Sequence, residues 1–313
     1  MSTLIVRRLV LALPTILVVS FLAFSMIRLN PDAIVAARLG EAYTPEAAQK
    51  VRQEYGLDKP MYTEYFRWMG RVLTGDLGTS AVSFKPVAKE LAPKIVVTLE
   101  LAAFAVFFAV LVGVPVGIVS AMRQDGWPDY ILRTFSILGL SVPGFYVATV
   151  VLTLLAVQFD WIPPLKYVAF WDNPVKNVQQ FAFPALILSL GTAASVMRFT
   201  RTMMLDVLRQ DYIRTAWAKG LRERAVVARH ALKNVMLPVI TILGLTMANL
   251  VGGTVIFESI FSLPGVGSYL QYAVFQKDFA PIQAVVLLFA SSVIIINLIV
   301  DISYTALDPR AKV

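Results

Sequence analysis

The chain has 313 residues, of which 58% are hydrophobic and 15% are charged, and it contains no cysteine and a single histidine. A soluble globular domain is nearer a quarter charged, so this composition argues against a soluble protein, and it leaves no thiolate or His-rich metal site. The net charge of +8 would suggest nucleic-acid binding in a soluble protein, but in a membrane protein it indicates loops that face anionic lipid and protein partners, with no nucleic acid.

The first predicted element is an apolar run at residues 9–27, which follows Arg7 and Arg8. The run is longer than the apolar region of a signal peptide, and residues 28–30 offer no cleavage site of small residues. We therefore interpret residues 1–29 as a retained transmembrane helix whose N-terminus is cytoplasmic.

Residues 30–94 form the one long polar stretch. Aromatic and apolar residues recur through it, and Thr44 followed by Pro45 is typical of a helix start, with threonine as the cap and proline at the first helical position. Its nine Lys/Arg and eight Asp/Glu nearly cancel, and loops this long are largely exempt from the positive-inside rule. The stretch is predicted to be an extracytoplasmic helical cap.

The next part of the chain, residues 95–307, is predicted to hold five more spans. Their apolar runs cover residues 95–122, 131–159, 181–197, 235–257 and 280–300. The segment 198–233 holds nine Lys/Arg against three acids, which places it in the cytoplasm by the positive-inside rule. The whole is an all-α membrane protein of about six transmembrane helices, with both termini, including the tail 308–313, in the cytoplasm.

Reactive side chains are sparse. The chain lacks a phosphate-binding loop, a zinc-protease motif and a nucleophile elbow, so no catalytic or metal-binding residue is predicted. The acids closest to the spans are Glu100, Glu258 and Asp301, and all lie near helix ends, where a carboxylate reaches water or caps a helix. An ion-coupled carrier would place acids near the bilayer midplane. Glu258 differs because it sits beside a glycine-rich bend that could face a pore.

Proline and glycine inside the third run mark a second place of interest. Pro143 and Gly144 predict a bend, and Phe145 directly follows it. Ordinary helix packing explains such residues as well as a transport pathway does. The candidates for a translocation pathway are thus Pro143, Gly144, Phe145 and Glu258.

The polar segment 205–233 is too polar to span a membrane, yet its apolar residues keep a helical period that breaks at Gly220. This pattern predicts a short helix, a glycine stop and a second amphipathic helix. Two interpretations remain open from the residues alone. The segment presents a helix to a cytoplasmic partner, or it rests on anionic lipid headgroups.

The stretch from Asp211 to Leu221, which reads DYIRTAWAKGL, resembles the cytoplasmic coupling motif of ABC importer permeases, and more narrowly that of the dipeptide/oligopeptide family. Further similarities occur in chain order at residues 55–60, 75–80, 258–267 and 301–310. The long segment after the first helix is similar to the B-type member of the family's two-permease pair. The general ABC motif begins Glu-Ala-Ala, whereas this chain has Arg214-Thr215-Ala216, a departure that the peptide family often shares.

This resemblance implies a permease subunit of an importer, not an enzyme. The implied partners are a second permease in a heterodimer, two ABC ATPase subunits that bind ATP and Mg²⁺, an extracytoplasmic solute-binding protein and membrane lipid; this chain itself would need no cofactor. The implied location is the inner membrane of a bacterium or archaeon. The implied substrate is a di- or oligopeptide, or else a nickel chelate, glutathione or an oligosaccharide. The residues expected to couple to the ATPase are Asp211, Tyr212, Arg214, Thr215, Ala216, Lys219, Gly220 and Leu221. The alternative is an ion-coupled secondary transporter or channel that acts without an ATPase.

Overall fold

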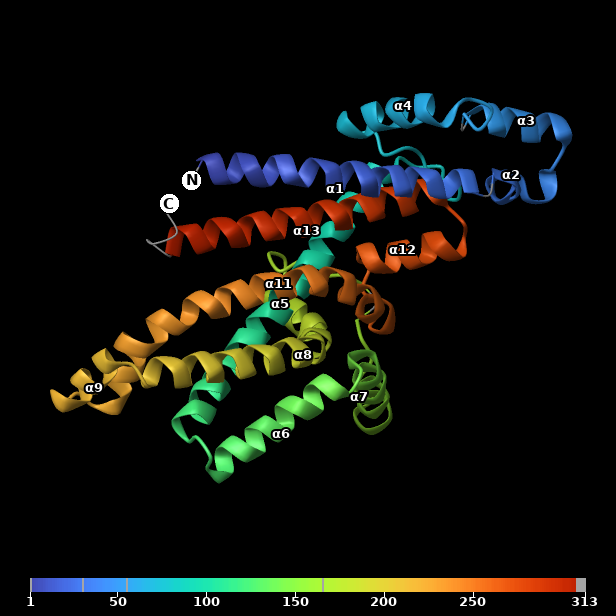
Figure 1. Ribbon diagram of the computed structural model, residues 1–313. Coiled ribbons are helices and arrows are strands. Elements are labelled where there is room, and N and C mark those ends of the chain that lie inside the picture. The colour runs from blue at the N-terminus through green and yellow to red at the C-terminus, as the bar shows by residue number, and fades with distance from the viewer. Residues whose placement is uncertain (1, 30, 55, 165, 308–313) are drawn as a thin grey trace. The chain divides into compact units, whose positions relative to one another are not determined.

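Helices dominate the chain (Figure 1). The computed structural model describes residues 2–29, 31–54, 56–164 and 166–307, so the predicted tail 308–313 lies outside the described residues. Within those ranges there is no β-strand, and the one β-bridge joins Thr79 to Pro86. The predicted all-α class is confirmed.

The helices are bounded as follows. They are α1 Ser2–Leu29, α2 Pro31–Leu39, η1 Gly40–Ala42, α3 Pro45–Glu54, α4 Met61–Leu73, α5 Val87–Met122, α6 Trp127–Ser141, α7 Gly144–Phe159, α8 Pro174–Leu208, α9 Asp211–Ala218, α10 Glu223–Ala225, the π-helical turn η2 Val226–Ala231, α11 Leu232–Ile260, α12 Val266–Phe275 and α13 Phe279–Leu307.

Three of the described helices are long and apolar enough to cross a membrane: α5, α8 and the part of α13 from Phe279 to Val300. Two bent pairs, α6 with α7 and the helix on either side of Pro238, raise this number to five if each pair is one span. The apolar part of α1, Val10–Met26, is shorter. The count of six therefore stays a prediction.

The predicted bend at Pro143 and Gly144 is present, and it is a complete break in the helix. The chain breaks between α6 and α7, whose axes differ by 96°. Val142 has an extended backbone with ψ of 125°, which is the conformation that a residue before proline favours, and Pro143 has no N–H to continue the helix. Proline and glycine thus produce a corner here rather than a gentle kink.

The described chain divides into two compact units, the first of which contains residues 2–98 and 264–294. Its polar cap is helical, as predicted, and the Thr44 hydroxyl accepts a hydrogen bond from the Ala47 N–H (3.2 Å), so the predicted start of α3 is confirmed. The cap is held to α1 by aromatic packing, since Phe24 meets Tyr65 edge-on at 5.6 Å between ring centres. The Tyr65 and Ser20 hydroxyls share a buried hydrogen bond of 2.8 Å.

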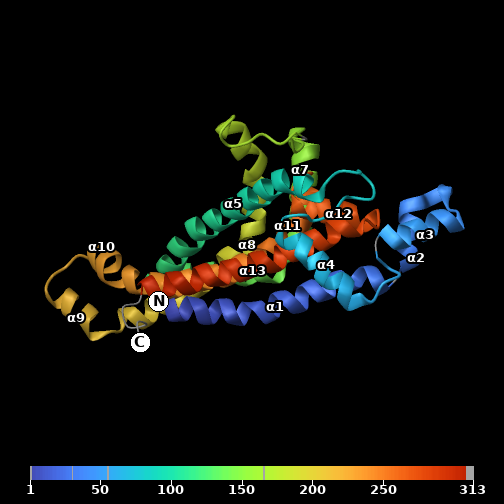
Figure 2. The ribbon, with the colours of Figure 1, turned by 90° about the horizontal axis from the view of Figure 1, so that it is seen from above.

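The second unit contains Leu99–Leu263 and the chain from Ile295 on, and α8 runs through its centre. Of the spanning window of α8, 67% is buried, against 33% for that of α5. Figures 1 and 2 show α11 lying beside α8, with α9 and α10 extending beyond their ends as a hairpin. On another side α5 crosses α8 at Gly113 and Gly117, where an added Cβ would lie 2.7 Å from a carbonyl oxygen of α8. Small residues at this spacing let two helix backbones approach closely.

Candidate functional site

Helix α9 is the centre of the polar segment 205–233, and it ends in the way that the sequence predicts. Gly220 adopts a left-handed backbone with φ of 77°. Its N–H donates to the Trp217 carbonyl (2.9 Å), and the next N–H, of Leu221, donates to the Ala216 carbonyl (3.3 Å). This pair of bonds is the Schellman motif, which closes a helix and turns the chain away. The second predicted helix follows as α10 and η2, but it continues into α11 instead of ending.

The two faces of α9 differ. Ile213 is completely buried and Ala216 is 6% exposed. Both belong to an apolar cluster that also includes Ala121 of α5 and Met204 of α8. The sequence grouped Ala216 with residues expected to meet a partner, but the structure places it in the core of the chain itself.

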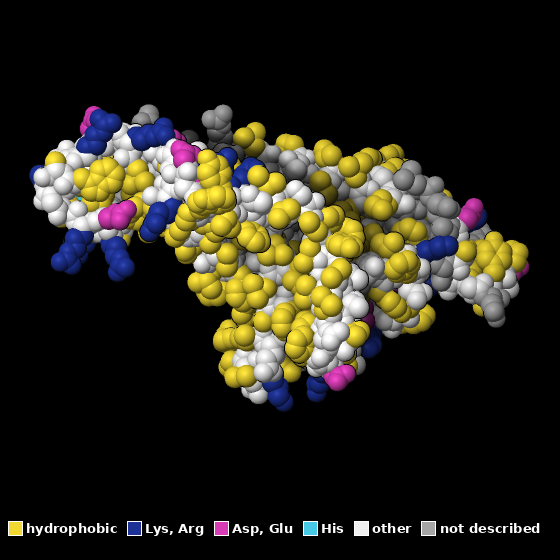
Figure 3. All heavy atoms as spheres, turned by 90° about the horizontal axis from the view of Figure 1, so that it is seen from below, with side chains coloured by type: hydrophobic (Ala, Val, Ile, Leu, Met, Phe, Trp, Pro, Cys, Tyr) yellow, Lys and Arg dark blue, Asp and Glu magenta, His cyan; other side chains and the backbone are white. Residues whose placement is uncertain are grey.

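The other predicted coupling residues, Asp211, Tyr212, Arg214, Thr215, Lys219, Gly220 and Leu221, are exposed. Among them the Tyr212 hydroxyl accepts a hydrogen bond from the Asn234 side chain (2.8 Å), which ties α9 to α11. Figure 3 shows Lys and Arg side chains gathered around an apolar patch at the end of the unit that carries α9.

Sequence reasoning missed Trp217 as a surface residue. Its side chain is 42% exposed, next to Leu221 at 41%. Helical spacing carries no signal for this exposure, because Trp217 follows Ile213 by four residues, which places the two on the same face of a helix. A half-exposed tryptophan among basic side chains is typical of protein interfaces, in which Trp and Arg are enriched.

A hollow of about 640 Å³ lies at the corner between α6 and α7, closed by α8 and α11. Pro143, Gly144 and Phe145 all line it, together with Phe257 of α11. Glu258, the fourth pathway candidate, is completely buried and is not among the lining residues. The structure therefore brings three of the four candidates together and separates the carboxylate from them.

Glu100 holds a loop rather than reaching water alone. Its carboxylate accepts hydrogen bonds from the Tyr167 hydroxyl (3.1 Å) and from the Asn177 amide (3.0 Å). Burial, and then the bond to Glu100, raise the pKa of Tyr167 to about 12, so this tyrosine stays a donor at any physiological pH. The third acid, Asp301, has its side chain outside the described residues.

Sequence reasoning also missed a buried ion pair. Asp129, at the start of α6, is fully buried, and Arg201 of α8 is 17% exposed. The guanidinium donates from Nε to one carboxylate oxygen (2.8 Å) and from Nη2 to the other (2.6 Å). The sequence analysis counted Arg201 within the basic segment 198–233 and assigned no role to Asp129. Two opposite charges within apolar helices were the only available signal.

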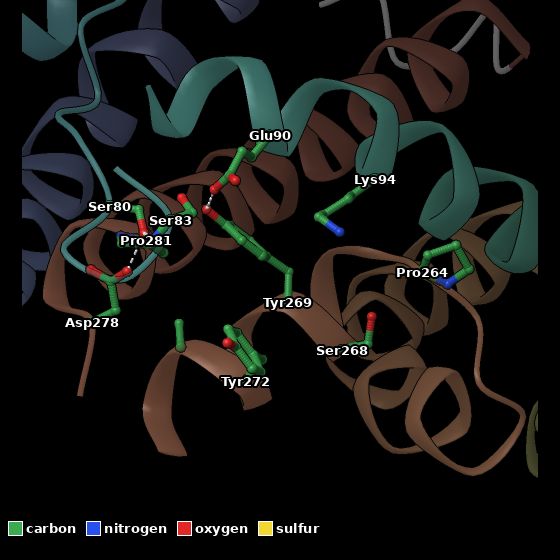
Figure 4. Close-up of a pocket in the computed structure, with 11 residues that line it drawn as sticks. Ser80, Ser83, Glu90, Lys94, Pro264, Ser268, Tyr269, Tyr272, Asp278 and Pro281 are labelled. Carbon is green, nitrogen blue, oxygen red and sulfur yellow. Dashed lines mark hydrogen bonds between the residues drawn. The ribbon is translucent and has the colours of Figure 1, made fainter. Parts of the chain in front are cut away.

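A second hollow, of about 360 Å³, lies in the unit that carries the cap (Figure 4). The Tyr269 hydroxyl of α12 donates to Glu90 of α5 (2.8 Å), and the Lys94 ammonium lies over the Tyr269 ring, 5.1 Å from its centre. At one end the Asp278 carboxylate accepts hydrogen bonds from the Ser80 hydroxyl and from the Ala81 N–H (3.0 Å). Asp278 therefore fixes the turn that begins at Ser80, within the cap segment 30–94.

Replacing Asp278 with asparagine should loosen this turn. The carboxylate is 3% exposed, and hydrogen bonds to a charged group are worth about 1.5–3 kcal/mol. Phe84, which is 67% exposed in the same turn, offers a site for chymotrypsin. We expect cleavage after Phe84 in the purified detergent-solubilised protein to be at least about tenfold faster in Asp278→Asn, since 1.4 kcal/mol corresponds to a factor of ten.

The matched control is Asp58→Asn, a change of an exposed carboxylate in the same unit. It should leave the rate of cleavage at Phe84 unchanged. Equal rates in both variants would show that Asp278 does not hold the turn.

No group of His, Cys, Asp and Glu in the described residues is arranged to hold a metal ion. The sequence family described as "Binding-protein-dependent transport system inner membrane component" matches residues 113–313, and the N-terminal family of the same systems matches residues 1–102. A dipeptide transport system permease protein of Alkalihalophilus pseudofirmus is 36% identical, covering 98% of both chains. A glutathione transport system permease protein of Pectobacterium atrosepticum is 38% identical, also covering 98% of both.

Two solved structures share the fold. The MetNI methionine ABC transporter in inward-facing conformations aligns with a TM-score of 0.58 and 18% identity, over 70% of this chain and 96% of that one. An amino acid ABC transporter solved with histidines aligns with a TM-score of 0.52 and 14% identity, over 70% and 94%. At these identities the likeness concerns the fold.

Proposed function

The chain belongs to the inner-membrane components of binding-protein-dependent transport systems and is a permease subunit of an ABC importer; from this premise we propose that it forms half of the pathway through which di- or oligopeptides cross the membrane. Its partners would be a second permease, two ATPase subunits that bind ATP and Mg²⁺, and an extracytoplasmic solute-binding protein. Membership of this family argues against the alternative of a carrier or channel that acts without an ATPase.

The proposed topology has six spans. They are α1, α5, α6 with α7 as one broken span, α8, α11 and α13. The nine basic residues of segment 198–233 favour a cytoplasmic α9, and an even number of spans then puts both ends of the chain on that side. Cysteines introduced singly into the cap and into α10 test this, because the chain has none of its own. A membrane-impermeant thiol reagent added to intact spheroplasts should label only the cap.

Helix α9 would be the surface that docks on an ATPase. The observation that carries this proposal is that α9 has a buried side and an exposed side. Ile213 and Ala216 anchor the helix in the core, whereas Trp217 and its basic neighbours are exposed. Such a helix moves as part of the membrane unit and still presents a partner surface. ATP-driven closure of the ATPases would shift α9 as a rigid body, and α8 and α11 would carry the shift towards the corner hollow.

Gly220→Val should impair transport while leaving membrane insertion intact. No atom lies within 4 Å of an added Cβ, so the reason is backbone strain and not crowding inside the chain. A residue with a Cβ loses about 1–2 kcal/mol in the left-handed region, and a β-branched residue is affected most. We expect about a tenfold lower rate of substrate uptake at equal membrane abundance.

Gly220→Asn is the matched control, because asparagine tolerates the left-handed region. It should keep most of the uptake. If Gly220→Val transports as well as Gly220→Asn, the end of α9 has no part in coupling.

Purification of the tagged chain from its native membrane in mild detergent tests the assembly. The expected result is recovery of a second permease and ATPase subunits, identified by mass spectrometry. Recovery of the chain alone, with solute flux that does not need ATP, would contradict the proposal.

Peptide as the substrate rests on the names of the relatives, which transport dipeptides and glutathione. Uptake of a radiolabelled dipeptide into cells with and without this chain tests it. The dipeptide should enter only when the chain is present, and unlabelled oligopeptide should compete. Competition by glutathione, a nickel chelate or an oligosaccharide alone would name a different substrate.

A further inference from the structure

The Asp129 carboxylate is saturated by donors from three parts of the chain. Arg201 of α8 binds both of its oxygens, the Ser120 hydroxyl at the end of α5 donates to one, and the Asp125 N–H in the intervening turn donates to the other (3.1 Å). A buried charge is tolerated when its partners are this complete, yet a well-packed apolar pair at the same place is often as stable. Stability alone therefore does not account for the pair.

The position of the Asp129–Arg201 pair, close to α9, suggests a role in transmitting movement. Arg201 lies about two helical turns before the end of α8, which leads through two residues into α9. The same stretch of α8 is pressed against α5, because Gly113 and Gly117 leave no space for a Cβ. In addition, α9 buries Ile213 in the cluster that contains Ala121 of α5. A shift of α9 therefore cannot be absorbed by α8 alone.

Helix α6 extends from this pair to the corner hollow. Asp129 is in its first turn, and its last residue, Ser141, is followed directly by Val142 and Pro143, which line the hollow. With 15 residues at 1.5 Å each, α6 is about 22 Å long. It is a straight connection between the end of the unit that carries α9 and the place where α6 and α7 meet.

We propose that Asp129, Arg201 and Ser120 are positioning residues that make α5, α6, α8 and α9 move as one body, so that ATP turnover in the ATPase docked on α9 displaces the α6–α7 corner. The inference rests on the proposed function and extends it, since it adds α5 and α6 to the helices that carry the movement. The bidentate geometry is what transmits force: two parallel bonds resist rotation of α6 against α8, which a single contact permits.

The decisive variant is the double replacement Asp129→Leu/Arg201→Met in the complete importer, reconstituted in lipid vesicles with its partners. It replaces both charges with apolar side chains that can pack against each other, so the complex should still assemble. The measured quantity is the number of substrate molecules transported per ATP hydrolysed. We expect ATP hydrolysis within about twofold of the unmodified importer and transport per ATP at least about tenfold lower. Unchanged transport per ATP in an assembled double variant would overturn the proposal.

Arg201→Lys decides the question if the double variant fails to assemble. Lysine keeps the charge but makes only a point contact, where arginine makes two parallel bonds. Transport per ATP should fall severalfold in the assembled complex, and an unchanged value would again overturn the proposal. The control is Arg133→Gln, which changes an exposed arginine of α6 and should leave transport per ATP unchanged.

Spin labels give a readout that a purely structural role would not change. Labels at Arg133 of α6 and at Arg209, between α8 and α9, should report one narrow distance with and without ATP in the unmodified importer. In the double variant this distance should broaden when ATP is added. Failure of the ATPases to bind at all would refute the proposed function, whereas normal binding with an unbroadened distance would refute only this inference.

Discussion

Gly113→Leu is expected to abolish the folded permease. The new Cβ would lie 2.7 Å from the Ala193 carbonyl oxygen and 2.9 Å from Val196 on α8. A backbone oxygen cannot rotate away as a flexible side chain does, so the two helices must separate. Overpacking of a close-packed interior typically costs about 1–3 kcal/mol, and a whole leucine at a helix crossing belongs at or above the upper end. Size-exclusion chromatography in detergent should show aggregation instead of a single peak.

Gly139→Ala is the control for this change. Gly139 faces the same helix from α6, but an added Cβ there would be 3.6 Å from the Ala194 Cβ, which is ordinary contact. This variant should elute as the unmodified protein does and have a similar thermal midpoint. A well-folded Gly113→Leu would mean that α5 and α8 are not in the close contact described above.

Trp217→Ala should weaken binding of the ATPase by about 2 kcal/mol or more, which is a loss of about 30-fold in affinity. The reason is that a large aromatic side chain at the centre of an interface contributes much of its binding energy. The measurement is the affinity of purified ATPase for the detergent-solubilised permease, by biolayer interferometry.

Trp171→Ala is a suitable comparison, since this tryptophan is 82% exposed in the loop between α7 and α8, far along the chain from α9. It should not change the affinity for the ATPase. If Trp217→Ala also leaves the affinity unchanged but reduces binding of α9 peptides to anionic vesicles, the segment is a lipid-contacting helix, as the second interpretation of its sequence holds.

Local chemistry made much of the fold predictable. The cap at Thr44 and the end of α9 at Gly220 are each decided by one side chain and a few backbone bonds, so a short stretch of sequence contains the information. Long apolar runs likewise predicted α5, α8 and α13, although the helices extend beyond the apolar residues, because helical hydrogen bonding does not stop where hydropathy falls.

Tertiary features were not predictable in this way. The run 131–159 is apolar on both sides of Pro143, so its hydropathy does not predict the 96° angle between α6 and α7. No helix was predicted between the apolar runs 235–257 and 280–300, so the ten-residue helix α12 was missed. Asp129 and Arg201 are 72 residues apart, and only the crossing of α6 and α8 brings them together.

The residues that hold α9 in place differ from the residues that a partner would contact, so the two sets can change independently. The helix is held in place by its glycine end, by two inward apolar side chains and by the hydrogen bond between Tyr212 and Asn234. A partner would touch the remaining exposed side chains. Substitutions on the outer face can therefore change which ATPase is accepted without disturbing the membrane unit. To exchange ATPases between related importers, the outward residues would be transplanted first, and Tyr212, Ile213, Ala216 and Gly220 would be kept.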